Sequence, residues 1–298
     1  MIEVHEVRKF YSTVTAVAGI SFTLRDGRIT GFLGPNGAGK STTMRMMAGI
    51  EKPDRGRCLV EDQPPSSLTD PMRTLGVLLD GQGAIPGMRA RDYLRSVAAP
   101  PRIPDSRVDH LLTVVGLDSV SGRRVRTFSL GMKQRLGLAV ALLGDPKHLI
   151  LDEPINGLDP DGVIWIRNLL RQLADEGRCV FLSSHLMSEL EQCVDDLVII
   201  DKGHLLGQGP IDAIINGTRK ATVAVSSTDD GLLASVLSGA GADVVIDGSR
   251  LIVSGLDAGQ IGALAHREDL VLSLLAPQQG GLEDAYLSIT RGQEVQEQ

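Results

Sequence analysis

The sequence has no long apolar run and no basic leader. No window reaches the ~18 to 20 consecutive apolar residues that a membrane-spanning helix requires. The amino-terminal residues 1–7 lack the basic start and apolar centre of a secretory signal peptide. We therefore expect a cytoplasmic protein that reaches a membrane only through a partner.

Cysteine is also scarce. Cys58, Cys179 and Cys193 show no C-x-x-C spacing, and each lies in or beside an apolar run. This pattern favours small core side chains in a reducing compartment over disulfide bonds, metal ligands or reactive thiols.

The sequence also has fewer basic than acidic residues. The formal net charge is −7, whereas a protein that binds nucleic acid broadly needs a strongly basic face, so we expect no nucleic-acid partner. With 298 residues and 42% hydrophobic content, the chain can bury a sizeable core and form about two domains. No internal repeat or low-complexity tract interrupts it.

The clearest motif is the glycine-rich segment GPNGAGKS at residues 34–41, which fits G-x-x-x-x-G-K-[ST] at every fixed position. Glycine permits backbone conformations in which successive N–H groups face inward and surround an anion. Lys40 then reaches the β- and γ-phosphates of a nucleotide, and the Ser41 hydroxyl holds Mg²⁺. An apolar strand at 29–33 and a helix at 41–48 supply the context that the motif requires.

Short apolar runs recur along the chain with helical patterns between them. Fully apolar strands separated by helices favour a parallel sheet covered on both faces, which is an α/β fold. Helical periodicity replaces strands from residue 89 to about 144, which predicts a helical insertion. Tyr11 is placed in a polar turn. The strands that we expect in this part are 2–7, 14–17, 20–24, 29–33, 58–60, 74–79, 148–151, 179–182 and 197–200.

The character of the chain changes after residue 217. The expected order from residue 220 onward is strand, helix, two strands, helix, strand and helix, with a hairpin turn at residues 247–248. This order predicts a small, separate α+β domain at 220–298, ferredoxin-like in its connectivity.

Two adjacent acids follow the apolar strand at 148–151. Ligands of open α/β sheets bind at the carboxyl ends of strands, where Asp152 and Glu153 would lie. Asp152 is predicted to hold Mg²⁺ directly or through water, and Glu153 to polarise the attacking water. Two solvated acids at a strand end are the alternative.

The segment FSLGMKQR at residues 128–135 resembles, in a variant form, the signature L-S-G-G-Q of the ATP-binding cassette (ABC) family. It lies about twenty residues before Asp152, as the family requires, and opens an apolar helix expected at 136–143. Ser129 and the N–H of Gly131 lie at this helix start, ready to bind phosphate. The resemblance covers roughly residues 1–217. It implies the P-loop NTPase fold in its ABC form, with an antiparallel β subdomain and a helical subdomain at about 87–144.

In that family the signature closes on the nucleotide held by the other subunit. The resemblance therefore implies a head-to-tail homodimer that encloses two ATP molecules. It also implies that Tyr11 stacks on adenine and that His185 bonds the γ-phosphate and the water. An ordinary turn tyrosine and a structural histidine are the alternatives at these positions. The loop at 156–159 corresponds to the one that contacts the opposite subunit.

One position departs from the family pattern. The family usually has glutamine at the end of the strand that leads into the helical insertion. Aligning Pro86 with the family's proline places Asp80 there, with Gln82 two residues later. We assign Asp80 as the Mg²⁺ or water contact. The following stretch, 83–91, is where the family receives the coupling helix of its membrane partner.

The resemblance extends to function. The ending at residues 281–290 resembles that of bacterial ABC-2 exporter subunits, which implies an ATPase on the inner face of the membrane that drives a separate permease for a drug, antibiotic or lipid-like substrate. A soluble cassette acting on DNA or ribosomes is the alternative, although the chain lacks long coiled coils and a second cassette. A third possible function is that of a regulatory module in which ATP binding is vestigial. The predicted sites are catalytic Glu153, His185 and Lys40, nucleotide-binding Tyr11, Asn36, Gly37, Gly39, Lys40, Ser41, Thr42, Ser129 and Gly131, and metal-binding Ser41, Asp152 and Asp80.

Overall fold

The computed structural model describes residues 1–79, 84–100, 102–218, 222–248, 250–278 and 281–294. The chain divides into two compact units, Met1–Ile211 and Asp212–Gln298. The division that we expected from the sequence, between residues 217 and 220, stays a prediction. None of the described helices is long and apolar enough to cross a bilayer.

The first unit is built on a six-stranded sheet with the strand order β5-β6-β7-β3-β8-β9. The first five strands in this order run parallel, and β9 pairs antiparallel with β8. The predicted parallel sheet is thus confirmed, while β9 at its edge was missed. Its strands are β3 (Ile29–Leu33), β5 (Leu75–Leu78), β6 (His148–Leu151), β7 (Cys179–Ser183), β8 (Asp196–Asp201) and β9 (His204–Pro210).

A second sheet of the same unit has the antiparallel order β2-β1-β4. Its strands are β1 (Ile2–Tyr11), β2 (Val14–Leu24) and β4 (Arg55–Val60). The predicted strands at 14–17 and 20–24 are one strand, because Gly19, at φ +101°, lies where the pairing register with β1 shifts rather than at a strand end. Tyr11 is the last residue of β1 and not part of a turn, so that expectation was wrong.

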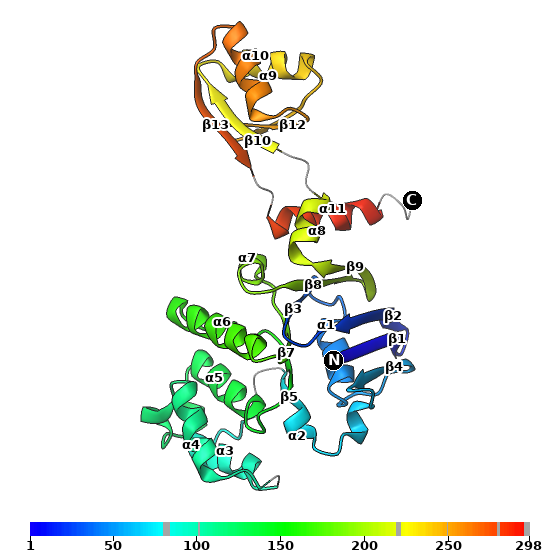
Figure 1. Cartoon of the computed structure of the whole chain (residues 1–298), viewed down its shortest axis with the longest axis vertical. Coiled ribbons are helices and arrows are strands. Elements are labelled where there is room, and N and C mark those ends of the chain that lie inside the picture. Colours follow the sequence, from blue (N-terminus) through cyan, green and yellow to red (C-terminus); the bar gives the residue numbers. More distant parts are fainter. Residues whose placement is uncertain (80–83, 101, 219–221, 249, 279–280, 295–298) are drawn as a thin grey trace. The chain divides into compact units, whose positions relative to one another are not determined.

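Helices fill the segments between the strands. The helical insertion is confirmed by α3, α4 and α5, which lie together in Figure 1. The helix after the signature begins at Leu130 and not at residue 136, because the Ser129 hydroxyl caps it by accepting a hydrogen bond from the Met132 N–H at 3.2 Å. The helices of this unit are α1 (Lys40–Met47), α2 (Pro71–Thr74), α3 (Ala90–Ala98), α4 (Asp105–Val114), α5 (Leu130–Ala141), α6 (Pro160–Asp175) and α7 (Met187–Glu191), with short 3₁₀ turns at Pro65–Ser67, Asp118–Val120 and Val125–Thr127.

The core of this unit joins the two sheets. Phe22 on β2, Phe32 on β3 and Phe181 on β7 have ring centroids 5.0–5.9 Å apart. Such tilted contacts between large apolar rings stabilise the packing beyond simple burial. The three cysteines are buried and free, as predicted.

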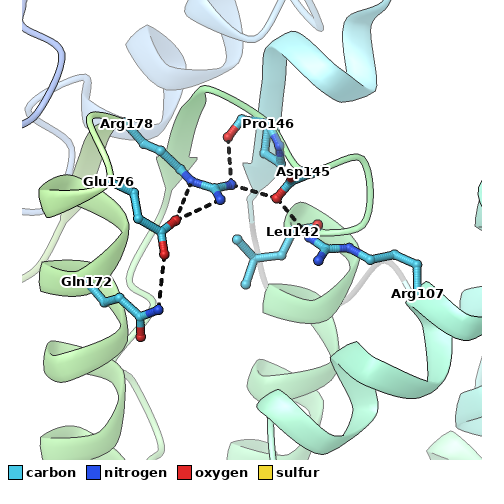
Figure 2. A network of polar contacts seen from close by, with 7 residues as sticks. All are labelled: Arg107, Leu142, Asp145, Pro146, Gln172, Glu176 and Arg178. Atoms are coloured by element: carbon cyan, nitrogen blue, oxygen red, sulfur yellow. Dashed lines mark hydrogen bonds and ion pairs between the residues drawn. The ribbon is translucent and has the colours of Figure 1, made fainter.

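A polar network connects the helical insertion to the turn before β6 (Figure 2). Arg107 on α4 donates from Nη2 to the Leu142 carbonyl at 2.9 Å and to Asp145 Oδ1 at 3.0 Å. Arg178, just before β7, donates from Nη1 to the same carboxylate oxygen at 3.0 Å. Asp145 therefore ties α4 to the sheet that carries the predicted catalytic acids.

The second unit contains a four-stranded antiparallel sheet with the order β11-β12-β10-β13. The sequence of elements, strand-helix-strand-strand-helix-strand, and this spatial order are ferredoxin-like, as expected. Apolar side chains of the strands pack on α9 and α10 in their own core. Its elements are α8 (Ile211–Thr218), β10 (Thr222–Ser227), α9 (Asp230–Gly239), β11 (Asp243–Asp247), β12 (Arg250–Ser254), α10 (Ala258–Arg267), β13 (Leu272–Gln278) and α11 (Leu282–Glu294).

Candidate active site

The glycine-rich loop leaves the carboxyl end of β3 and leads directly into α1. Gly39 precedes the helix in a left-handed conformation, at φ +101°. A Cβ on Gly39 would lie 2.4 Å from the Ala16 carbonyl oxygen, and one on Gly34 would lie 2.4 Å from the Ile200 carbonyl oxygen. Neither position can hold a side chain without moving backbone, so the loop requires both glycines.

Lys40 lies inside this loop with 8% of its surface exposed. Its ammonium donates to the Gly34 carbonyl at 2.6 Å and to the Pro35 carbonyl at 3.1 Å. Burial lowers the pKa of Lys40, while the carboxylates of Glu153 and Asp152 oppose that shift. A phosphate group in the loop would add negative charge beside the ammonium and favour its protonated form.

Asp152 follows β6 and accepts hydrogen bonds on both oxygens. Ser41 donates its hydroxyl to Oδ2 at 2.8 Å, and Ser183 donates to Oδ1 at 2.5 Å. The Ser41 hydroxyl and the Asp152 carboxylate are hard oxygen donors side by side at the phosphate loop, which is a donor set that fits Mg²⁺. The third predicted metal contact, Asp80, lies outside the described residues together with Gln82.

Glu153 faces His185 across the ends of β6 and β7. Glu153 Oε2 lies 2.7 Å from His185 Nδ1, and the His185 backbone N–H also donates to Oε2, at 3.4 Å. The backbone of Glu153 is left-handed, at φ +49°. Two hydrogen bonds hold it there: Gln134 Nε2 donates to its carbonyl at 2.8 Å, and its N–H donates to Ser183 Oγ at 2.9 Å.

A cavity of about 480 Å³ lies over the phosphate loop. Its size suits a nucleotide-sized ligand. Eight predicted residues line it, namely Asn36, Gly37, Gly39, Lys40, Ser41, Thr42, Asp152 and Glu153. It is also lined by Ala16, Leu130, Gln134 and Asn156. Tyr11, Ser129, Gly131 and His185 are absent from this lining.

Comparison with known proteins agrees with this geometry. Residues 17–156 match the family described as ABC transporter. The chain is 40% identical over 223 residues to the bacitracin transport ATP-binding protein BcrA of Bacillus licheniformis, which covers 74% of this chain and 73% of that protein. The chain belongs to the ABC transporter family. It is an ABC ATPase, the ATP-binding and ATP-hydrolysing subunit of a transporter.

One further relative matches nearly the whole ABC ATPase, and other matches cover single parts of it. BcrA of Enterococcus faecalis is 32% identical over 300 residues, covering 98% of this chain and 97% of that protein. A solved dimer of the ATP-binding cassette MJ0796 with ADP and Pi has a TM-score of 0.64 at 20% identity, covering 70% of this chain and 98% of that one, which shows the shared fold. Residues 221–283 match a domain of unknown function, DUF8746.

The signature of the ABC ATPase rests on the loop at residues 156–159. A Cβ on Gly131 would lie 2.8 Å from the Gly157 carbonyl oxygen, and one on Gly157 would lie 2.4 Å from the Leu130 side chain. Glycine at both positions therefore lets the start of α5 approach this loop closely. Ser129 and Gly131 lie at that start, outside the lining of the chain's own nucleotide cavity.

Tyr11 of the ABC ATPase is held by Glu51, which lies in the connection between α1 and β4. Its hydroxyl donates to the Glu51 carboxylate, with distances of 2.6 and 2.7 Å to the two oxygens, and this bond raises the pKa of Tyr11. Lys9 lies 5.6 Å from the ring centroid. The residue is 44% exposed.

Sequence interpretation missed two residues of the ABC ATPase site, Ser183 and Gln134. Ser183 is the polar last residue of an otherwise apolar strand, and Gln134 is a buried amide on the signature helix. Ser183 carried a usable signal, because a polar group at the end of an apolar strand needs a buried partner. Gln134 did not, because the helix was expected to begin only at residue 136. What the sequence did not show is that both partners belong to Asp152 and Glu153.

Proposed function

We propose that this ABC ATPase is the motor of an exporter, with Glu153 as the base that activates water for ATP hydrolysis. The observation that carries the proposal is the contact of Glu153 Oε2 with His185 Nδ1 at 2.7 Å, next to the Ser41–Asp152 pair. Glu153 accepts the proton of the attacking water. His185 orients the Glu153 carboxylate and contacts the γ-phosphate.

The remaining charged groups bind the nucleotide. Lys40 exchanges its two carbonyl partners for the β- and γ-phosphate oxygens. The backbone N–H groups of the loop, with Asn36 and Thr42 beside them, surround the phosphates. Ser41 and Asp152 are the residues that hold Mg²⁺, with Asp80 as a further candidate. When bound, Mg²⁺ neutralises charge that develops on the phosphate oxygens.

We further propose that two copies complete each site. Ser129 and Gly131 do not line the cavity of their own chain, so their phosphate-binding helix start is available to the nucleotide of a second copy. ATP then joins two copies head to tail, and hydrolysis lets them separate. A separate integral membrane permease would convert this closing and opening into transport, which places the subunit on the cytoplasmic face of the membrane.

The class of substrate is inferred from relatives. Two relatives at 40% and 32% identity are named as bacitracin transport proteins. We propose a peptide antibiotic or a similar amphipathic molecule as the exported substrate. No observation in the described part of the chain favours a DNA- or ribosome-associated role.

Mixing two inactive variants tests the shared site. Lys40→Ala disables the phosphate loop, and Ser129→Ala disables the signature. A mixed dimer keeps one intact site, so equimolar mixing should recover about a quarter of the unaltered rate, since about half of the dimers are mixed. No recovery would contradict the head-to-tail arrangement.

Co-purification with a membrane protein tests the exporter assignment separately. The chain is expressed together with a candidate permease, a multi-span membrane protein sought among the reading frames beside its gene, and the two are purified in detergent through a tag on the membrane protein. We expect the ATPase to co-purify and its ATP turnover to respond to the permease. Failure to associate would contradict the transport role while leaving the ATPase activity intact.

A further inference from the structure

Three side chains with metal-binding atoms meet at the amino-terminal edge of the large sheet, opposite the nucleotide edge. His148 begins β6, Cys179 begins β7 directly beside it, and Asp26 lies in the turn before β3. One ligand atom from each lies within 4.8 Å of the others. His148 Nδ1 and an Asp26 carboxylate oxygen are 3.6 Å apart.

His148 is the unusual member of this group, because it is 1% exposed and its Nδ1 has no hydrogen-bond partner. Its other nitrogen, Nε2, lies 3.4 Å from Glu61 Oε1. A proton on Nε2 would be donated to this carboxylate, and this tautomer leaves a lone pair on Nδ1. Histidines that bind metals are commonly oriented by such a carboxylate on their second nitrogen.

Burial sets the protonation of His148 and Cys179, the two buried side chains of this cluster. Burial, followed by the nearby amino-terminal ammonium, lowers the pKa of His148, which keeps the imidazole uncharged near neutral pH. Burial raises the pKa of the Cys179 thiol to about 12. Burying the Nδ1 lone pair of His148 without a hydrogen-bond donor costs free energy. A bound metal ion would offset this cost.

We propose that Asp26, His148 and Cys179 form a binding site for a divalent cation of the Zn²⁺ type. Tetrahedral Zn²⁺ with ligands at its usual bond lengths places ligand atoms about 3.3–3.8 Å apart. The 3.6 Å separation of His148 Nδ1 from Asp26 Oδ1 is already in this range. The other two pairs lie within 4.8 Å, so they need side-chain shifts of at most about 1 Å. Sulfur, nitrogen and oxygen donors together favour Zn²⁺ over Mg²⁺, which prefers oxygen alone.

Charge and protons balance in this step. Binding forms a metal–sulfur bond and releases the Cys179 thiol proton to solvent, so one carboxylate and one thiolate neutralise the divalent cation. The ammonium of Met1 already lies 2.7 Å from one Asp26 oxygen. This oxygen, Oδ1, is also the one that lies 3.6 Å from His148 Nδ1, so a metal bound through it would displace the ammonium to Oδ2 or to solvent. The fourth position is left to water.

The place of the site suggests a structural role. The strands β3, β6 and β7 are neighbours, and their opposite ends lead to the phosphate loop, to Asp152 and to His185. A metal that joins their amino-terminal ends would stabilise the sheet without touching the nucleotide. We had expected Cys179 to be a simple core residue, and the buried unpartnered nitrogen beside it is what changes this interpretation.

Cobalt binding tests the site directly in the full-length protein. Co²⁺ coordinated by a thiolate gives a sulfur-to-metal charge-transfer band that oxygen sites do not give, and excess Mg²⁺ keeps the nucleotide site occupied. We expect this band in the unaltered protein, its loss in Cys179→Ser, and its displacement by Zn²⁺. In Asp26→Asn the band should appear only at a higher Co²⁺ concentration, because the thiolate remains but one ligand is lost. Zn²⁺ affinity should fall at least about 10-fold in either variant.

Matched variants keep the test decisive. Cys58 lies outside the cluster, and burial raises the pKa of its thiol to about 12 as well. Cys58→Ser should therefore leave the band intact. Asp26, with a side chain 55% exposed, can be changed without disturbing the core, so Asp26→Asn remains informative if Cys179→Ser fails to fold. The proposal is overturned by the absence of a band in the unaltered protein, by a band that survives Cys179→Ser, or by an unchanged Co²⁺ titration in Asp26→Asn.

Discussion

Ser183 and Asp152 are bonded across two neighbouring strands of the sheet, with the Ser183 hydroxyl 2.5 Å from Asp152 Oδ1. The same hydroxyl accepts the Glu153 N–H at 2.9 Å. One side chain from β7 therefore fixes both acids that follow β6. Ser183 and Asp152 are both buried, so solvent does not compete for the hydrogen bond between them.

The variant Ser183→Ala should weaken both stability and catalysis. It leaves one buried carboxylate oxygen and one backbone N–H without their partner, which should lower the free energy of unfolding by about 1–3 kcal/mol. We expect the turnover number for ATP to fall while ATP still binds, since the phosphate loop is unchanged. Urea denaturation and steady-state kinetics measure the two effects.

Ser184→Ala is the matched control for this prediction. Ser184 is also buried, but its hydroxyl accepts the Leu186 N–H at 3.0 Å and does not contact the acids. Its turnover number should stay close to that of the unaltered protein. An equal loss of turnover number in Ser183→Ala and Ser184→Ala would mean that Ser183 does not act by positioning Asp152 and Glu153.

The sequence predicted the parts of the site that are local. The phosphate loop, Asp152 and Glu153 each lie in a short segment with its own strand, so a linear pattern was enough to find them. Ser183 and Gln134 act on these acids from 31 and 19 residues away in the chain. Such a pairing follows from strand order and helix packing, which a single sequence does not display.

The errors in the fold have similarly local causes. The break expected between the strands at 14–17 and 20–24 is an irregularity within β2, where Gly19 lies. The edge strand β9 contains two glycines and ends at a proline, a composition that favours loops. The second unit was predicted well, because its strands and helices alternate with clear turns between them.

Glu153→Gln should separate ATP binding from hydrolysis. The amide can still accept a hydrogen bond but cannot take a proton from water, so turnover should fall by about 10²-fold or more. ATP binding should persist, and the protein should accumulate as a dimer in ATP, measured by light scattering after size exclusion. Asp175→Asn, an exposed acid at the end of α6, is the control. Normal turnover in Glu153→Gln would remove Glu153 from the proposed role.

Two substitutions at Tyr11 distinguish adenine stacking from a structural role. Tyr11→Phe removes the hydrogen bond to Glu51 but keeps the ring, whereas Tyr11→Ala removes both. If the ring stacks on adenine, Tyr11→Ala should lose about 1 kcal/mol of binding, a roughly 5-fold rise in the KM for ATP. Tyr11→Phe should be close to the unaltered protein. An equal rise in both variants would assign the effect to the Glu51 contact.

The Arg107–Asp145–Arg178 network should give stability that is lost in acid. Burial raises the pKa of Asp145, but the hydrogen bond and charge of Arg178, with the charge and hydrogen bond of Arg107, outweigh it and leave the pKa below its ordinary value. A carboxylate with a lowered folded-state pKa stabilises the protein fully above its unfolded-state pKa. This contribution is lost as the pH falls through the folded-state value.

Asp145→Asn measures that contribution. The Asp145 side chain is 58% exposed, so solvent screening limits the expected loss to about 1 kcal/mol or less at pH 7. The difference in urea midpoint between the unaltered protein and Asp145→Asn should begin to narrow as the pH falls below about 4, where the unfolded chain takes up a proton at Asp145 before the folded protein does. Asp175→Asn should show little difference at either pH. A gap that stays constant or widens in acid would show that charge on Asp145 does not hold α4 to the sheet.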